Sequence, residues 1–368
     1  MILKRFCAES FRNIEKCNIE LSPGVNLLLG NNAQGKTNAI EGINIFSRGK
    51  SFRGSEDREL IKFGSQGFRI KIDFDSSGME NTLEYALFGK ERLRKKNGYK
   101  INRVSEMIGS FRSILFNPDN LRIVKDGPEE RRNFLSAAIS QIYPEYIKYY
   151  ADYKNALENR SFLLKCASKG MYFEEGEIIS WSHSLAEYAS FIYIYRRDYV
   201  EKLKLHATRI MTEISDGKEE LYISYESDIK ENIKKREEIK EEYKRIFTSE
   251  IKREMAAGVT LFGPHRDNLE ININGNPARH FASQGQIRSI VLSLKIAEGE
   301  VCRDIFGEYP VFLLDDVLSE LDEKRRNYLL SGKDDRQIII TSCDKDNLNI
   351  NIDRIIDVEE GKYVSSYR

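Results

Sequence analysis

Long hydrophobic runs are missing from this sequence. No apolar stretch approaches the roughly 18 residues that a membrane-spanning helix needs. No apolar core follows the basic start Met1-Ile2-Leu3-Lys4-Arg5, as it does in a signal peptide. These absences predict a cytoplasmic protein that has no membrane partner.

Metal-binding and disulfide patterns are missing too. The five cysteines are scattered without a Cys-x-x-Cys pair, so neither a zinc site nor a disulfide framework is indicated. Charge of one sign is not in excess, because Lys plus Arg and Asp plus Glu both number 58. Net charge therefore argues neither for nucleic acid nor against it, and any basic surface must be local.

The chain has 368 residues, of which 40% are apolar and 32% charged, and this length allows two domains. Its first part is rich in short strands, which we expect at residues 3–8, 17–21 and 25–29. Apolar and polar residues alternate at residues 68–74 and 83–87, which predicts antiparallel strands.

A tight hairpin is predicted at Asn97-Gly98, since this pair is typical of two-residue turns. The arms of the hairpin hold the densest basic patch of the chain, made of Lys90, Arg92, Arg94, Lys95, Lys96, Lys100 and Arg103. The patch can neutralise phosphates, although a hairpin whose charges are simply solvated is an equal alternative.

Helical periodicity dominates residues 119–256, where Phe134, Ala138 and Ile142 repeat at helical spacing. The end of this stretch predicts one or two exposed helices. Strands return after Gly258, so we expect a helical insertion domain at 119–256 and a second domain built from 1–118 and 257–368.

A phosphate-binding turn stands out between a predicted strand at 25–29 and a predicted helix. The turn fits G-x-x-x-x-G-K-[ST] at every fixed position. In this pattern the glycines let backbone N–H groups curl around phosphates, the lysine neutralises the phosphates and the threonine ligates Mg²⁺. The residues expected to contact ATP are Gly30, Asn31, Asn32, Ala33, Gln34, Gly35, Lys36 and Thr37.

An acidic partner for the turn follows the apolar run at 311–314. Asp315 is expected to hold the Mg²⁺ shell together with Thr37, and Asp316 lies where a general base or water-orienting group belongs. Lys36, Asp315 and Asp316 are therefore catalytic candidates. Because the two halves lie near opposite ends of the chain, one nucleotide site must be assembled from both ends.

Three further stretches resemble the ABC-type ATPases. Ser283-Gln284-Gly285-Gln286 is similar to their signature motif with Gln in place of the first glycine, residues 319–322 (SELD) are similar to their D-loop, and Thr341-Ser342 stand where their switch histidine is found. The resemblance implies that Ser283, Gly285 and Gln286 contact the ATP of a second subunit, in a head-to-tail dimer formed on ATP, with Ser283 a catalytic group. Independently, Ser283 and Gln286 form a capping box, which alone accounts for a helix start.

Within that superfamily the chain resembles the RecF family of bacterial recombinational repair. The motifs that carry this resemblance are Phe11-Arg12-Asn13, the phosphate turn, SRGKSFRGS at 47–55, GPHRDNL at 263–269, SQGQIR at 283–288 and LLDDVLSELD at 313–322.

The resemblance implies an α/β ABC-type P-loop ATPase domain, with a Rossmann-like core and an antiparallel β lobe, built from both chain ends around a mainly helical insertion. It also implies ATP and Mg²⁺ as cofactors, nucleotide contacts from Arg12 and Asn13, and supporting roles for His265 and Arg266. The implied partners are DNA at gaps or junctions, a second subunit on ATP, and RecO and RecR in recombinase loading.

Two departures from the ABC pattern predict slow hydrolysis in a chain that is expected to be a weak, DNA-dependent ATPase. Many of these enzymes carry Glu where this chain has Asp316, and a side chain one methylene shorter retracts the carboxylate by about 1.5 Å. The missing switch histidine removes a contact to the γ-phosphate. The glutamine of the Q-loop is absent as well, so that either Asn117 or Asp119 could replace it.

DNA binding is expected to be independent of sequence and sensitive to salt, because no base-reading motif is present. Besides the basic hairpin, Arg48, Lys50 and Arg53 form a local basic patch. The alternative functions are the nucleotide-binding subunit of another ABC-type ATPase, either a transporter or an SMC-like protein, and an ATPase fused to a nuclease. The segment after Asp316 is too short for a nuclease domain.

Overall fold

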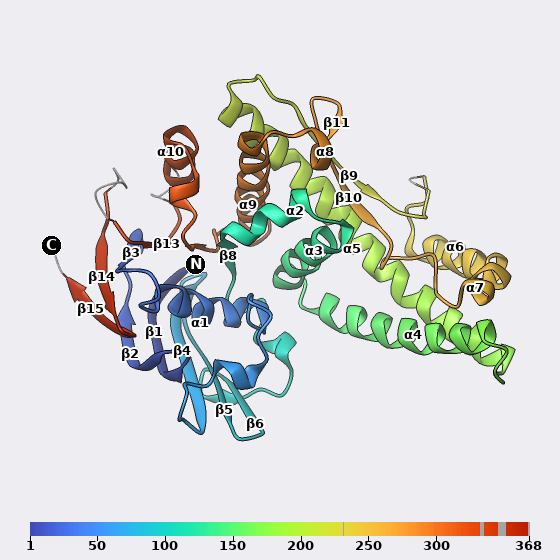
Figure 1. The fold of residues 1–368 in the computed structure, drawn as a ribbon, viewed down its shortest axis with the longest axis horizontal. Coiled ribbons are helices and arrows are strands. Elements are labelled where there is room, and N and C mark those ends of the chain that lie inside the picture. Colours follow the sequence, from blue (N-terminus) through green and yellow to red (C-terminus); the bar gives the residue numbers. More distant parts are fainter. Residues whose placement is uncertain (231, 332–334, 345–350, 367–368) are drawn as a thin grey trace. The chain divides into compact units, whose positions relative to one another are not determined.

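The computed structural model describes residues 1–230, 232–331, 335–344 and 351–366 (Figure 1). These residues form two compact units. Unit 1 comprises Met1–Arg122, His206–Glu220 and Ala282–Arg368, and unit 2 comprises Ile123–Leu205 and Leu221–Phe281. Unit 1 is therefore assembled from both ends of the chain.

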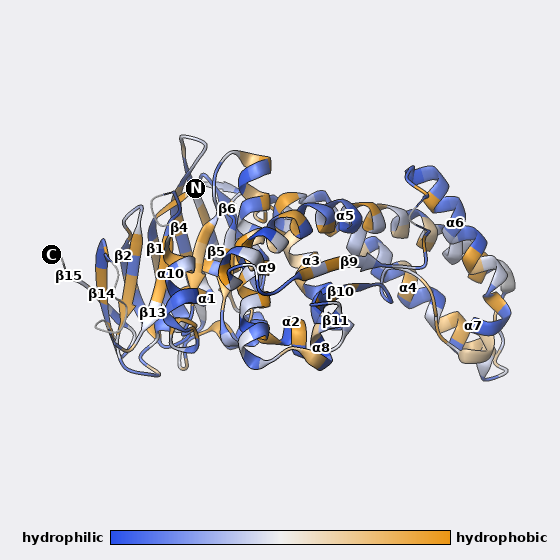
Figure 2. Ribbon diagram, turned by 90° about the horizontal axis from the view of Figure 1, so that it is seen from above, coloured by the Kyte–Doolittle hydropathy of each residue, from blue (hydrophilic) through white to orange (hydrophobic). Residues whose placement is uncertain are grey.

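An antiparallel sheet forms one part of unit 1, with the strand order β2-β1-β4-β5-β6-β7. Its strands are β1 (Ile2–Phe11), β2 (Ile14–Glu20), β4 (Gly67–Ser76), β5 (Met79–Phe88), β6 (Glu91–Lys96) and β7 (Tyr99–Lys100). Buried and exposed residues alternate along β1 and β4, and Figure 2 shows apolar and polar residues side by side on these strands. The predicted antiparallel pairing of β4 with β5 is confirmed.

The predicted hairpin at Asn97-Gly98 is confirmed as the turn between β6 and β7. Lys96 pairs with Tyr99, and Asn97 and Gly98 have φ angles of 50° and 83°. Two successive positive φ angles are what a two-residue turn between twisted strands requires. The Asn274-Gly275 pair makes the same kind of turn in unit 2, where Ile273 pairs with Asn276.

A mainly parallel sheet forms the other part of unit 1, with the order β15-β14-β3-β13-β12-β8. Its strands are β3 (Val25–Leu29), β8 (Ser113–Phe116), β12 (Val311–Leu314), β13 (Ile338–Ser342), β14 (Arg354–Glu359) and β15 (Lys362–Ser366). Three helices of unit 1 are α1 (Lys36–Arg48), α9 (Gln284–Phe306) and α10 (Glu323–Ser331). Strand β13 pairs with both β3 and β12, which sets the carboxyl ends of these three strands side by side.

One hydrophobic core joins the two sheets of unit 1. It includes Phe6 and Phe74 of the antiparallel sheet, Ile40 of α1, and Leu313 and Ile339 of the parallel sheet. The α/β fold with an antiparallel lobe that the sequence predicts is thus confirmed.

Unit 2 is mainly helical and also contains a small antiparallel sheet, β11-β10-β9. Its elements are α2 (Arg122–Lys125), α3 (Pro128–Ile142), α4 (Glu145–Ser168), the first part of α5 (Glu175–Ser215), β9 (Leu221–Glu226), α6 (Arg236–Ser249), α7 (Ile251–Ala257), β10 (Asn268–Ile273), β11 (Asn276–Pro277) and α8 (Ala278–Phe281). Strand β9 lies inside the stretch 119–256, which the sequence predicts to be mainly helical. Strand β9 pairs with β10, so β10 belongs to the mainly helical unit 2.

The sequence-based domain limits at residues 118/119 and 256/257 stay predictions. In the structure the chain passes between the units after Arg122, Leu205, Glu220 and Phe281.

Candidate nucleotide site

The phosphate turn, residues 30–37, joins the end of β3 to the start of α1, and all eight residues expected to contact ATP lie in it. Its glycines are required by geometry. A Cβ atom at Gly30 would meet the carbonyl oxygen of Val358 at 2.2 Å, and Gly35 has a φ of 117°. Gly35 precedes α1 without a side-chain cap, so the first N–H groups of the helix are available to an anion.

The ammonium group of Lys36 lies within this turn. It donates hydrogen bonds to the carbonyl oxygens of Gly30 at 2.5 Å and Asn31 at 3.0 Å, and it lies 3.3 Å from Cys343 Sγ. Only 4% of Lys36 is exposed. Its charge is thus held inside the phosphate turn, and its role as a phosphate ligand stays a prediction.

Asp315 and Asp316 follow β12, and one hydroxyl group connects them. Thr341 Oγ1 is 3.0 Å from Asp315 Oδ1 and 3.3 Å from Asp316 Oδ1, and it accepts the backbone N–H of Asp316 at 2.9 Å. Thr37 Oγ1 donates to Asp315 Oδ1 at 2.9 Å. The structure therefore brings Thr37 of the turn and both aspartates together.

Burial raises the pKa of the Asp315 carboxyl, while the hydrogen bonds from Thr37 and Thr341 act in the opposite direction. A cation at this carboxylate would favour its ionised form. Asp316 differs from its neighbour because it is exposed, and its φ of 52° is unusual for a residue other than glycine.

Asn117 directly follows β8, the strand that pairs with β12. The backbone N–H of Asp315 donates to the carbonyl oxygen of Phe116 at 2.9 Å, which sets Asn117 beside the aspartates. Asn117 is buried, and its Oδ1 atom has no hydrogen-bond partner among the described residues. Asp119, the other Q-loop candidate, is exposed in the short helix η3 (Pro118–Leu121).

These oxygen atoms suit Mg²⁺, which prefers hard oxygen ligands. The Thr37 hydroxyl, the Asp315 carboxylate and the unpartnered Asn117 carbonyl lie at neighbouring strand ends. No group of three or more His, Cys, Asp or Glu side chains suited to a metal occurs in the described ranges. A metal held here therefore needs oxygen ligands from water or phosphate besides those of the protein.

Asn13 and Arg12 form the turn between β1 and β2, and they behave differently. Asn13 Nδ2 donates to the carbonyl oxygen of Gln34 at 3.1 Å, and Asn13 Oδ1 accepts from Asn38 at 2.7 Å, which holds it against the phosphate turn. Arg12 instead donates two hydrogen bonds, of 2.9 and 2.6 Å, to the carboxylate of Glu41, which is 0% exposed. Arg12 thus neutralises a buried charge of α1.

Ser283, Gly285 and Gln286 lie at the start of α9. Ser283 Oγ accepts the N–H of Gln286 at 3.2 Å, and Gln286 Oε1 accepts the N–H of Ser283 at 2.8 Å, so the predicted capping box is confirmed. Ser283 is exposed, and all of its hydrogen bonds given for the described residues are made within α9 or its cap. The structure therefore joins the phosphate turn to the aspartates but leaves the signature serine facing solvent.

Sequence reasoning missed three residues at this site. Tyr363 Oη donates to the carbonyl oxygen of Gly35 at 2.8 Å, and the thiol of Cys343 bonds Asn32 Oδ1 at 2.9 Å. Arg53, which was assigned to DNA, donates to Asn38 Oδ1 at 3.0 Å, and its charge lowers the pKa of Asp315. Only Arg53 carried a signal, as one of three cations in the SRGKSFRGS stretch at 47–55.

His265 and Arg266, expected to support the site, belong to unit 2. His265 Nε2 faces the carbonyl oxygen of Thr260 at 3.1 Å and must donate to it, so Nδ1 accepts from Tyr153 Oη at 2.6 Å. Burial lowers the pKa of His265 to about 4. The ring is therefore held neutral, and its contacts tie α4 to the 260–265 loop.

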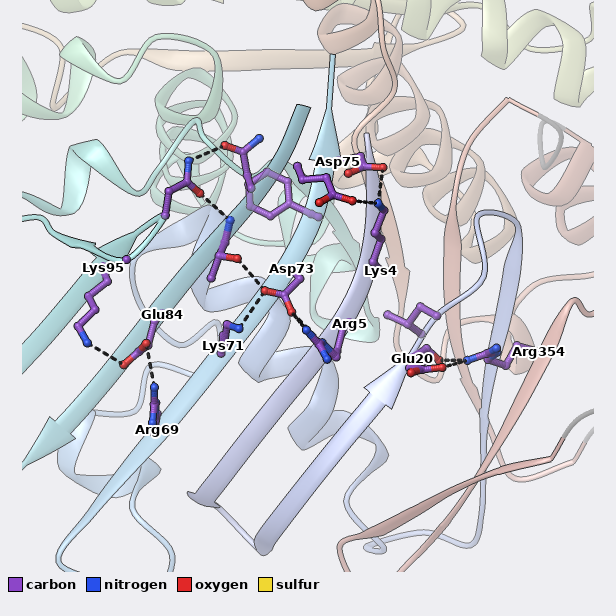
Figure 3. Close-up of a pocket in the computed structure, with 17 residues that line it drawn as sticks. Lys4, Arg5, Glu20, Arg69, Lys71, Asp73, Asp75, Glu84, Lys95 and Arg354 are labelled. Carbon is purple, nitrogen blue, oxygen red and sulfur yellow. Dashed lines mark hydrogen bonds and ion pairs between the residues drawn. The ribbon is translucent and has the colours of Figure 1, made fainter. Parts of the chain in front are cut away.

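A separate hollow of about 980 Å³ lies on the outer face of the antiparallel sheet (Figure 3). Its basic side chains face acidic ones, as in the ion pairs of Arg5 with Asp73 at 2.6 Å and Arg69 with Glu84 at 3.0 Å. Figure 3 shows further pairs of Lys4 with acidic side chains. Since its charges are largely compensated, the hollow is a poor site for a polyanion.

Known proteins are similar to this chain in sequence. Residues 2–365 match the family described as RecF/RecN/SMC N terminal domain. The chain is 36% identical over 376 residues to the DNA replication and repair protein RecF of Clostridioides difficile, covering 99% of this chain and 98% of that protein. RecF of Clostridium acetobutylicum is 37% identical over 343 residues, covering 93% and 92%.

Solved structures agree with the sequence relatives. The recombination mediator protein RecF-ATPrS in the RecFOR pathway has a TM-score of 0.92 and 35% identity, covering 99% of this chain and 97% of that chain. An Smc head domain of Pyrococcus furiosus, with a TM-score of 0.58 and 18% identity over 100% and 96% of the two chains, shares the fold alone.

The fold and the site define an ATPase of the ABC type whose architecture is also that of SMC heads. More narrowly, the chain belongs to the RecF family. No helix within the described ranges combines the length and apolar composition that crossing a bilayer demands.

Proposed function

We propose that this protein is an ATP-dependent DNA-binding protein of recombinational repair, in which ATP closes two chains around DNA and slow hydrolysis releases it. The observation that carries the proposal is the connection of Thr37, Asp315 and Thr341 at adjacent strand ends, beside the uncapped start of α1. ATP as ligand is further supported by the related RecF-ATP structure.

In this proposal the turn residues 30–37 and Lys36 bind the phosphates, and Thr37 and Asp315 hold Mg²⁺. Asn117 takes the Q-loop role rather than Asp119, because its unpartnered oxygen is buried beside Asp315. Asn13 orients the turn, and Arg12 acts on α1 through Glu41. When bound, Mg²⁺ neutralises charge on the phosphate oxygens.

Hydrolysis is proposed to be slow. Asp316 follows Asp315 after β12, and its side chain is one methylene shorter than the glutamate that many ABC-type ATPases carry there. Thr341 stands at the end of β13 in place of a histidine that could contact the γ-phosphate. Slow turnover suits a clamp whose lifetime is set by ATP.

Closure of the site is proposed to come from a second chain. The N-terminus of α9 places the N–H of Gly285 next to the exposed Ser283 hydroxyl, and such a terminus attracts phosphate, although the N–H of Gln286 already donates to Ser283 Oγ. Because Ser283 makes its hydrogen bonds within its own helix and cap, it is free to meet the ATP of a partner in a symmetric dimer.

The DNA surface is proposed to include the basic hairpin of β6 and β7. Lys90, Lys100 and Arg103 have no acidic partner within 4 Å among the described residues, whereas the hollow on the sheet face has its charges paired. Unpaired surface cations release counterions when they meet phosphates. The RecFOR pathway named for the solved relative suggests RecO and RecR as partners in loading a recombinase at gaps or junctions.

The test is fluorescence anisotropy of labelled DNA with no nucleotide, ADP or ATP, for the wild type, Lys36→Arg and Ser283→Arg. We expect ATP to tighten DNA binding by the wild type alone, while Ser283→Arg still binds ATP. DNA affinity that ignores nucleotide in all three proteins would overturn the clamp, and cleavage of the DNA would favour a nuclease instead.

A further inference from the structure

Phe63 is a fully exposed aromatic residue, with a relative exposure of 101%. It occupies the second position of a four-residue turn, in which the N–H of Ser65 donates to the carbonyl oxygen of Lys62 at 2.9 Å and Gly64 has a φ of 83°. Turns of this type favour proline at that position and need no aromatic ring there. The ring therefore has no role in folding that its surroundings explain.

The turn is fixed to the rest of the lobe. The N–H of Lys62 donates to the carbonyl oxygen of Ser10 at 2.8 Å, and Ile61 forms an antiparallel bridge with Phe11. A ring presented on such a turn loses little backbone entropy when it binds something. The ring of Phe63 is thus exposed on a turn that is held in place by backbone hydrogen bonds.

A second turn lies beside it, between β5 and β6. The N–H of Gly89 donates to the carbonyl oxygen of Gln66 at 3.3 Å. Phe88 is 56% exposed and its ring covers Gly67, where an added Cβ would lie 2.5 Å from the ring. We call residues 62–65 and 88–91 the aromatic rim.

The rim carries two cations, Lys62 and Lys90, and one acid, Glu91, and Arg58 adds a cation just before it in the chain. Arg58 and Lys90 are exposed and have no acidic side chain within 4 Å among the described residues, and Lys62 is only loosely paired, at 3.5 Å, with the exposed Glu15. A phenyl ring among unpaired cations is the composition of surfaces that hold single-stranded nucleic acid, where bases stack on aromatic rings and cations follow the phosphates. The core of a protein interface needs several contiguous apolar residues, which the rim lacks.

We propose that Phe63 stacks on an unpaired base of DNA. The inference rests on the proposed DNA binding. It adds a contact with a base, whereas the basic patches contact only phosphates. In a duplex the base faces are covered by their neighbours, so this contact requires an unpaired nucleotide. Because stacking releases no counterions, it strengthens binding without adding to the salt dependence.

The test measures binding of a single-stranded oligonucleotide that carries 2-aminopurine, over a series of salt concentrations. The proteins are the wild type, Phe63→Ala, Phe63→Trp and Met79→Ala. Met79 is the matched control, since it is an exposed apolar residue of 66% exposure on the turn between β4 and β5, at the other end of the strand that ends at Phe88.

We expect Phe63→Ala to weaken binding about tenfold at every salt concentration, with an unchanged slope of log K against log salt. Phe63→Trp restores affinity, and the fluorescence of the new tryptophan falls on binding. Met79→Ala binds as the wild type does. Circular dichroism confirms that each variant is folded.

Wild-type affinity in Phe63→Ala would overturn the proposal, as would a changed salt slope, which would make the effect electrostatic. An ATP-dependent change in molecular mass with unaltered DNA binding would assign Phe63 to contact with a second copy instead. If the wild type itself binds no DNA, the proposed function fails and takes this inference with it, which is a different result from a defect confined to Phe63.

Discussion

At the scale of single residues, Arg12 shows how a motif residue can support a site through other residues of the protein. The resemblance implies that Arg12 contacts the nucleotide, which stays a prediction, and the structure pairs Arg12 with Glu41, whose carboxylate is 0% exposed. An additional hydrogen bond of 2.7 Å joins Arg12 to Ser55. Arg12 therefore links α1, which begins at the phosphate turn, to the 51–60 loop.

Replacing Arg12 with Gln removes the main cation beside the buried carboxylate of Glu41. Part of the compensation remains, because Arg53 lies 3.5 Å from Glu41. Removing one partner of a buried pair typically costs about 3–5 kcal/mol. We expect faster hydrogen exchange in α1 and weaker ATP binding in Arg12→Gln, with both largely recovered in the double variant Arg12→Gln, Glu41→Gln. A loss of ATP affinity with unchanged exchange in α1 would return Arg12 to the nucleotide.

Two buried residues of the GPHRDN stretch titrate in opposite directions. Burial raises the pKa of Asp267 to about 7, against the effect of Tyr225 and Arg196, and burial lowers the pKa of His265 to about 4. A raised carboxyl pKa gives stability that is lost as pH rises toward 7. A lowered histidine pKa gives stability that is lost as pH falls toward 4, so the two effects oppose each other between these values.

Asp267→Asn separates these effects. Asp267 then no longer opposes His265, so the free energy of unfolding of unit 2 should rise more steeply than in the wild type as pH increases from about 4 to 6.5. Trp181, the single tryptophan, lies on the part of α5 in unit 2 and reports urea unfolding of that unit. Parallel pH profiles for the wild type and Asp267→Asn would contradict the assignment.

At the scale of elements, the start of α9 has one role in the structure and a second, proposed role that only a variant can separate from the first. Ser283 caps the helix through Gln286, and we propose that it also meets a partner's ATP. Aspartate caps a helix about as well as serine, whereas alanine costs roughly 1 kcal/mol. A carboxylate at this position would repel a γ-phosphate.

Ser283→Asp should therefore keep wild-type hydrogen exchange at the start of α9 and lose the ATP-dependent increase in mass measured by light scattering. Ser283→Ala should show faster exchange there. If Ser283→Asp associates on ATP as the wild type does, Ser283 is a helix cap and nothing more.

The elements that could be predicted from sequence are those specified by local chemistry. The phosphate turn around Gly35 and Lys36 could be predicted because its strand, its glycines and its helix are adjacent in the chain. The hairpin at Asn97-Gly98 could be predicted because both residues readily adopt positive φ angles. Strand β9 was missed because its alternation is short and lies among helical residues. The contact of Tyr363 with Gly35 depends on how β14 pairs with β3, which no local pattern encodes.

At the scale of the whole molecule, the chain carries no net charge, so any basic surface must be local. The hollow of Figure 3 balances its charges, while Lys90 and Lys100 are left unpaired among the described residues. Sequence composition could not distinguish these two surfaces, since both are rich in lysine and arginine. Which cations are unpaired follows only from the strand register.

The central claim is that each ATP site is completed by Ser283 of a second chain. The most direct test mixes two inactive variants, Lys36→Ala and Ser283→Asp, and measures ATP hydrolysis in the presence of DNA. In a head-to-tail dimer, a heterodimer of the two variants has one intact site of two, so the mixture should recover ATP hydrolysis that neither variant shows alone. A mixture that stays as inactive as its components would show that Ser283 does not act across the dimer, and would contradict the account.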